Sequence, residues 1–208
     1  MKDIKKIIDV LQKEYPKAKT ALHFSNPIEI LVATILSAQC TDERVNKVTA
    51  ELFKKYKTVD DYANADIKKF EQEIKSTGFY KMKAKNIINA TKIIKEKFNG
   101  KVPDTMQDLI TLPGVARKTA NVVLGNAYGK VEGIVVDTHV RRLSYRIGLT
   151  KNTDPNKIEQ DSIKIISKFF LSYRLTTFRA LSIQKRSFNI SALTTKLFSS
   201  YCKCFMFS

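Results

Sequence analysis

Apolar residues recur at spacings of three and four along the first two thirds of the chain, and no stretch alternates as a half-buried strand would. Ser25, Asn26 and Pro27 provide a capping residue followed by proline in a first helical turn. We expect the nearly all-apolar residues 28–39 to form a helix buried on most sides. Thr41 and Asp42 can cap a second, amphipathic helix. Its apolar positions are Val45, Val48, Leu52, Phe53 and Tyr56.

Four further helices are readable downstream. Residues 81–98 predict one helix, with Asn99 and Gly100 as its stop signal. Residues 104–110 and about 116–127 predict two more, joined by a tight turn at Pro113 and Gly114. Asp154 and Pro155 start a last helix that reaches about Phe169. The chain is therefore predicted to be all-α.

The turn at residues 112–124, which reads LPGVARKTANVVL, is the first candidate for chemistry. After Pro113 and Gly114 the backbone N–H groups at a helix start are unpaired, and they can hold a phosphate oxygen of DNA. An ordinary corner between two helices with a surface lysine is the alternative. A second candidate is Asp137, which follows the apolar residues 134–136 and suits a helix N-cap. Capping and catalysis can coexist in one carboxylate, whereas His139 is expected to be structural.

The amino-acid composition indicates what kind of partner the protein binds. The 208 residues carry a formal net charge of +17, and 43% of them are hydrophobic, which is enough for a folded core. Such a charge favours a polyanionic partner, although ribosome-like, membrane-surface and incidental charge are alternatives. No apolar run approaches the length needed to cross a bilayer, and the N-terminus lacks an apolar signal core. We therefore expect a cytoplasmic protein without a membrane partner.

Several separated motifs closely resemble endonuclease III, a helix-hairpin-helix DNA glycosylase. They are LPGVARKTANVV at 112–123, VDTHV at 136–140, LSAQCTD at 36–42, GFY at 78–80, KAKNI at 83–87 and GKVP at 100–103. The resemblance covers about residues 1–169. It implies two α-helical domains with DNA crossing the cleft between them. The first is a six-helix barrel at 21–129, and the second combines residues 1–20 and 130–170.

The resemblance also implies the reaction. Lys118 corresponds to the nucleophile and Asp137 to its essential carboxylate partner. The implied activity is that of a monomeric, nucleoid-associated bacterial enzyme of base excision repair that removes oxidised pyrimidines from damaged double-stranded DNA. A lyase step then cleaves 3′ to the abasic site by β-elimination. A lysine at its reference pKa of about 10.4 is protonated and inert, so such a site must supply a neutral amine.

The remaining implied contacts are with DNA. Gln39 corresponds to the residue that fills the space left by the extruded base, and Phe79 to an apolar wedge on the opposite strand. The alternative for Gln39 is a polar residue at a helix C-terminus, and the alternative for Phe79 is core packing. For Asp42, a cap without a DNA contact is the alternative. The hairpin residues implied to bind DNA are Leu112, Gly114, Val115, Ala116, Arg117 and Thr119.

The last 40 residues depart from the family. Endonuclease III proteins usually end with four cysteines that hold a [4Fe-4S] cluster, whereas this chain has Cys40, Cys202 and Cys204. We therefore predict no cofactor and no metal. Residues 162–208 contain no acidic residue and seven of the 12 phenylalanines, so we interpret residues 171–208 as a poorly folded basic tail from a different reading frame. A basic arm that binds nucleic acid is the alternative.

Such a tail would remove one wall of the second domain, so we expect a marginally stable protein of impaired activity. Two other functions stay open from the sequence. A monofunctional adenine glycosylase of the same superfamily is one, although those enzymes generally lack the lysine. A non-catalytic helix-hairpin-helix module that only binds DNA is the other.

Overall fold

The computed structural model describes residues 13, 20–130 and 132–169, and these residues form helices and loops with no strand. The all-α prediction is confirmed. The predictions for residues 1–12, 14–19 and 171–208 lie outside the described residues. The helices are α2 (Pro27–Leu36), α3 (Asp42–Lys55), α4 (Val59–Ala63), α5 (Ile67–Glu73), α6 (Tyr80–Lys97), α7 (Met106–Leu109), α8 (Arg117–Ala127), α9 (Thr138–Arg146) and α10 (Pro155–Phe169), with a 3-10 turn η1 at Lys75–Thr77.

Helix boundaries follow the predicted caps in most places. The Asn26 side chain accepts a hydrogen bond from the Glu29 N–H at 3.0 Å, and Thr41 caps α3 in the same way. Asn99 and Gly100 both take positive φ angles, 50° and 71°, and so end α6. The prediction for α2 was wrong at its end, because the helix stops three residues before Gln39. The short elements α4, α5 and η1 were not predicted.

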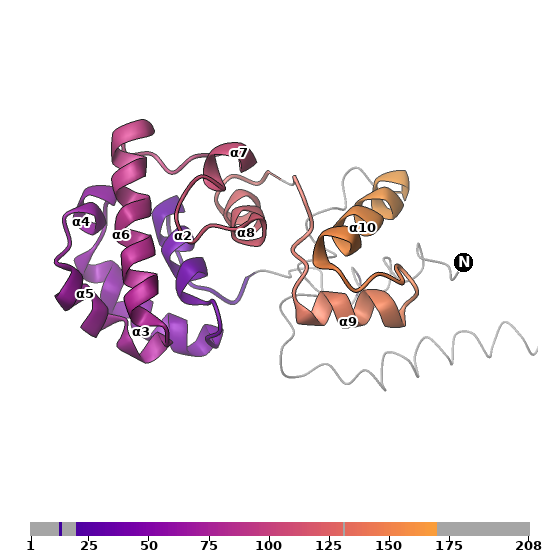
Figure 1. Cartoon of the computed structure of the whole chain (residues 1–208), viewed down its shortest axis with the longest axis horizontal. Helices are drawn as coiled ribbons and strands as arrows, with labels where there is room; N and C mark the ends of the chain where they lie inside the picture. The colour runs from indigo at the N-terminus through magenta and orange to yellow at the C-terminus, as the bar shows by residue number, and fades with distance from the viewer. Residues whose placement is uncertain (1–12, 14–19, 131, 170–208) are drawn as a thin grey trace, which may run out of the picture.

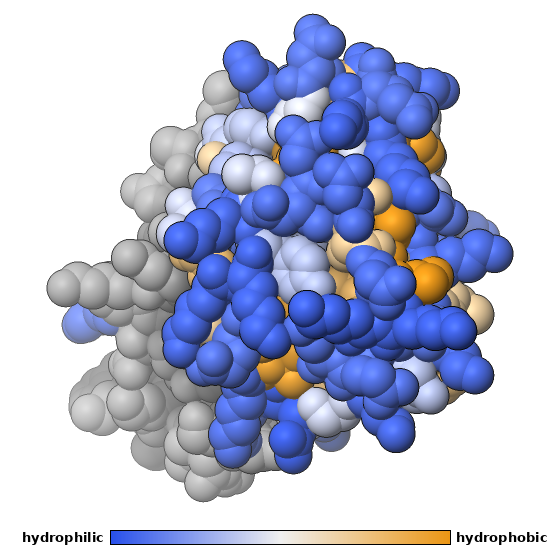
Figure 2. Space-filling model, turned by 90° about the vertical axis from the view of Figure 1, so that its left-hand side faces the viewer, coloured by the Kyte–Doolittle hydropathy of each residue, from blue (hydrophilic) through white to orange (hydrophobic). Residues whose placement is uncertain are grey.

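Helix α2 lies at the centre of the larger group of helices. All its residues from Ile28 to Leu36 are buried, and it packs against α3, α6 and α8. Figure 1 shows α6 as a long helix beside α2. The side of this group that carries α3 to α6 is covered mainly by hydrophilic side chains, with small hydrophobic patches between them (Figure 2). This core therefore supports the segments at both ends of α2.

Helices α9 and α10 pack against each other beside that group (Figure 1). The buried apolar side chains of these helices and of the loop between them lie outside the cluster formed by the earlier helices; they are Val140, Leu143, Leu149 and Ile158. The division into two domains with a boundary near residue 130 stays a prediction. In the part of the chain that the structure describes, no helix is long and apolar enough to span a bilayer.

Candidate nucleic-acid interface and active site

The hairpin between α7 and α8 is a tight turn pressed against α6. The Val115 N–H donates to the Leu112 carbonyl at 3.1 Å, and Gly114 has a φ of +77°. A Cβ atom at Gly114 would lie 2.9 Å from both Cβ and Nδ2 of Asn86 on α6. Glycine is therefore required here twice, by its backbone conformation and by the close approach of α6.

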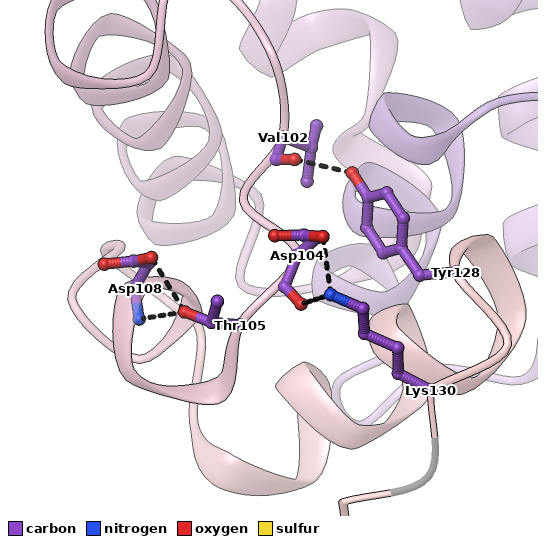
Figure 3. A network of polar contacts seen from close by, with 6 residues as sticks. All are labelled: Val102, Asp104, Thr105, Asp108, Tyr128 and Lys130. Carbon is purple, nitrogen blue, oxygen red and sulfur yellow. Dashed lines mark hydrogen bonds and ion pairs between the residues drawn. The ribbon is translucent and has the colours of Figure 1, made fainter.

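The open end of the hairpin is held by polar contacts, which Figure 3 shows. The Tyr128 hydroxyl, after α8, donates to the Val102 carbonyl at 2.5 Å. Lys130 Nζ donates to the carbonyl of Asp104 at 2.9 Å and also pairs with its carboxylate, which lowers the pKa of Asp104. Thr105 caps α7 by accepting from the Asp108 N–H at 3.2 Å. These contacts join the segment before α7 to the segment after α8.

The N-terminus of α8 has no side-chain cap, so the N–H groups of its first turn have no acceptor within the helix. Its N-cap is Ala116, which cannot accept a hydrogen bond through its side chain. Lys118 lies exposed in the first turn, and Gly114 and Arg117 are exposed beside it, with Thr119 half-buried. Leu112 and Val115 have side chains buried in the core, so DNA could reach only their main chains. This part of the hairpin can receive an anion next to an amine.

Glu159 on α10 connects three parts of the chain. Its Oε2 accepts from Arg117 Nε at 3.1 Å, and its Oε1 accepts from Asn121 Nδ2 at 3.1 Å. The same Oε1 accepts from the Ile134 N–H at 3.1 Å. Glu159 is buried, whereas half of the Arg117 side chain stays exposed. One carboxylate therefore links the start of α8 to the segment that leads to Asp137.

Gly133 permits this close packing. A Cβ atom there would lie 2.0 Å from Glu159 Oε1 and 2.6 Å from Asn121 Nδ2, so any larger residue would displace these two side-chain ends. Three residues after Ile134, Asp137 Oδ1 accepts from the Val140 N–H at 2.8 Å, which confirms the predicted N-cap of α9. A three-residue step spans at most about 10 Å, so Asp137 stays close to the Glu159 junction.

Gln39 and Phe79 occupy two similar turns. Both have left-handed backbones, with φ angles of 53° and 49°, and both side chains are exposed. Phe79 is 63% exposed, so core packing as its role is wrong. Met82, one turn further along α6, is also exposed and extends the apolar surface. The contacts of Gln39 and Phe79 with DNA stay predictions.

Sequence reasoning missed Lys83, because nothing in the local sequence distinguishes it from its neighbours Lys81 and Lys85. Lys83 is only 4% exposed. Its Nζ donates to the carbonyls of Leu36 and Thr77, at 2.8 Å each. Burial lowers the pKa of Lys83, and the nearby Cys40 opposes this shift.

The residues of this chain do not fit the cluster that the resemblance implies. A [4Fe-4S] cluster held by cysteine needs four thiolates, and the sequence contains three cysteines. Of these, Cys40 is partly buried against the hydrophobic core. Within residues 20–130 and 132–169, no group of three or more His, Cys, Asp and Glu side chains could hold a metal ion.

Comparison with known proteins assigns the family. Residues 32–168 match the HhH-GPD superfamily of base excision DNA repair proteins. The chain is 56% identical over 160 residues to an endonuclease III of Synechocystis sp., covering 77% of this chain and 73% of that protein. It is 43% identical to the protein in a solved non-covalent endonuclease III–DNA complex, with a TM-score of 0.79 over 86% of this chain and 82% of the other. A trapped covalent endonuclease III–DNA intermediate gives the same identity and TM-score, over 86% and 83%.

The family match covers the hairpin, Lys118 and Asp137. The helical fold and the separated motifs agree with the match. The chain therefore belongs to the endonuclease III family of HhH-GPD base excision repair proteins and is a DNA glycosylase.

Proposed function

We propose that this chain is a bifunctional DNA glycosylase and abasic-site lyase that removes oxidised pyrimidines from duplex DNA. The observation that carries the proposal is the position of Lys118, exposed in the first turn of α8 directly after the hairpin. Similarity to a protein trapped as a covalent DNA intermediate supports it. A lysine at a helix start beside bound phosphate is well placed to attack the sugar of the same nucleotide.

The proposed reaction uses the Lys118 amine as nucleophile. Its neutral form bonds to the sugar C1′ while the bond from C1′ to the base breaks, and the base leaves with the electron pair and takes up a proton. The sugar ring opens to give a Schiff base with Lys118. Loss of a proton from C2′ then expels the 3′ phosphate, and water releases the sugar from the lysine. Asp137 is proposed to accept the lysine proton and to stabilise positive charge on the sugar.

The hairpin and the two turns are proposed to prepare the nucleotide for attack. The backbone donors at the N-terminus of α8 would hold a phosphate, and Gln39 and Phe79 would enter the base stack on the two strands. Extruding a base costs a few kcal/mol, and less for a damaged pair, so filling the gap stabilises the open state. The exposed left-handed turns that carry both side chains support this assignment.

We further propose that the chain acts as a monomer on chromosomal DNA in the bacterial cytoplasm and binds no iron–sulfur cluster. The cysteine count supports the absence of the cluster. Iron and acid-labile sulfide analysis of the purified protein should give neither element. Sedimentation with a short damaged duplex should give one protein per DNA.

Borohydride trapping on a duplex that contains an oxidised pyrimidine tests the lyase. We expect a covalent adduct and strand cleavage with the natural chain, and neither with Lys118→Ala. Lys97→Ala is the matched control, because it removes the same charge from an exposed position at the far end of α6. Base release without an adduct would instead identify a monofunctional glycosylase. Salt-dependent binding without base release would identify a DNA-binding module.

A further inference from the structure

Lys83 is a buried lysine, and its Nζ donates to two main-chain carbonyl groups. In the described residues it makes no ion pair. Removing an ammonium group from water is costly unless nearby dipoles compensate. The carbonyl at the C-terminus of α2 is one such dipole, because helix C-termini carry partial negative charge. A long apolar side chain could fill the same volume, but it could not bind either carbonyl.

The two carbonyls belong to the two exposed turns. Leu36 is the last residue of α2 and precedes Gln39 by three residues, and Thr77 precedes Phe79 by two. The Lys83 N–H also donates to the Phe79 carbonyl at 3.0 Å. Among the described residues other than glycine, positive φ angles occur at Gln39, Phe79 and Asn99, so two of three lie in these turns. One side chain thus ties together both left-handed turns.

We propose that Lys83 is a positioning residue that holds the turns of Gln39 and Phe79 at a fixed separation, so that both side chains enter the duplex together. The proposal rests on the proposed function, because it takes both side chains to contact DNA. Lys83 touches neither the substrate nor the reacting atoms. It stabilises the extruded state of the nucleotide, because that state requires the side chains of Gln39 and Phe79 in place.

Lys83→Met tests the proposal, since it keeps the length of the side chain and removes the amine. The first measurement compares its affinity for a duplex that contains an uncleavable abasic-site analogue with its affinity for an intact duplex. The second follows base extrusion by 2-aminopurine fluorescence. The expected result is a loss of about 10- to 100-fold in discrimination between the two duplexes, with weaker extrusion. Neither readout requires chemistry, so a failed lyase assay would not affect them.

Two comparisons separate positioning from a general loss of structure. Ile94→Ala removes a fully buried side chain from the same helix, and it should destabilise the protein while keeping duplex discrimination. Lys83→Met should add little to Gln39→Ala combined with Phe79→Ala, because interacting residues are not additive. Full additivity, or full discrimination by folded Lys83→Met, would overturn the proposal. Equal losses with single-stranded and duplex abasic DNA would also overturn it, because single strands need no extrusion.

If Lys83→Met does not fold, Gln39→Ala tests the connection with Lys83 intact. Amide hydrogen exchange is followed on adding the abasic-analogue duplex, at residues 38–40 and 78–81. We expect Gln39→Ala to weaken the protection that DNA gives to both turns. Protection lost only at residues 38–40 would show that the turns act separately and would overturn the proposal.

Discussion

Arg117 on α8 and Glu159 on α10 form an ion pair with Nε and Oε2 3.1 Å apart. Because Arg117 directly precedes Lys118, the pair fixes the start of the proposed catalytic helix against α10. The same carboxylate binds the Ile134 N–H, three residues before Asp137. The relative position of the two proposed catalytic residues therefore depends on a glutamate that is not itself catalytic.

Replacing Glu159 with alanine should therefore lower both stability and activity. The change leaves the buried Asn121 amide and the Ile134 N–H without their acceptor, and we expect a loss of about 2 to 3 kcal/mol in the free energy of unfolding. Urea unfolding and single-turnover trapping measure the two effects. Glu96→Ala, which changes an exposed glutamate on α6, is the control. Unchanged trapping in Glu159→Ala would show that the junction does not position the catalytic pair.

Gly114→Ala should destabilise the protein more than Gly100→Ala. Both glycines have positive φ angles, 77° and 71°, so each change carries a backbone strain of about 1 to 2 kcal/mol. Only at Gly114 would the new Cβ also meet Asn86, whereas nothing lies within 4 Å at Gly100. Thermal unfolding of the two variants measures the difference, which is expected to be about 1 to 3 kcal/mol. Equal losses would show that the hairpin can move away from α6.

Substitutions of Asp137 should separate its capping role from its proposed catalytic role. Asn is as good an N-cap as Asp, so Asp137→Asn should keep the stability of α9 but lose trapping activity. Asp137→Ala should lose activity and also about 1 kcal/mol of stability. Unfolding and borohydride trapping, measured on both variants, separate the two roles. Full activity in Asp137→Asn would remove the carboxylate from the proposed mechanism.

Asp161 should make stability depend on pH in the acid range. Hydrogen bonds from Thr150 and Asn152 lower the pKa of Asp161 below its ordinary value. Its stabilising contribution is therefore complete above the unfolded pKa of about 3.9 and is lost as the pH falls through the lower folded value. The stability difference between the natural chain and Asp161→Ala should be constant near neutral pH and shrink below about pH 4. A difference that does not shrink as the pH falls below about 4 would contradict this assignment.

Local signals predicted much of the fold. The start of α10 is an example, since Asp154 accepts from the Lys157 N–H at 2.9 Å as a cap should. The hairpin and the cap at Asp137 were also readable, because each depends on residues close together in the sequence. The helices α4 and α5 were missed because five or seven residues show little hydrophobic periodicity, whereas the shorter α7 was predicted beside the turn at Pro113 and Gly114.

Long-range contacts were not readable in the same way. Glu159 lies 42 residues from Arg117 in the sequence, and Lys83 lies 47 residues from Leu36. Neither has a motif of its own, and a lysine in α6 is expected to face solvent. The early end of α2 was missed for a related reason: the Leu36 carbonyl is bound by Lys83, so the chain turns there instead of extending the helix.

The close approach of Gly114 to Asn86 connects α6 to the hairpin as well as to Phe79, and both are proposed to contact DNA. Phe79 directly precedes α6, and Asn86 lies six residues after the first residue of that helix, about 9 Å along its axis. If Phe79 is the wedge and the hairpin binds phosphate, as proposed, the rigidity of α6 would set how far from the bound phosphate the base stack is opened.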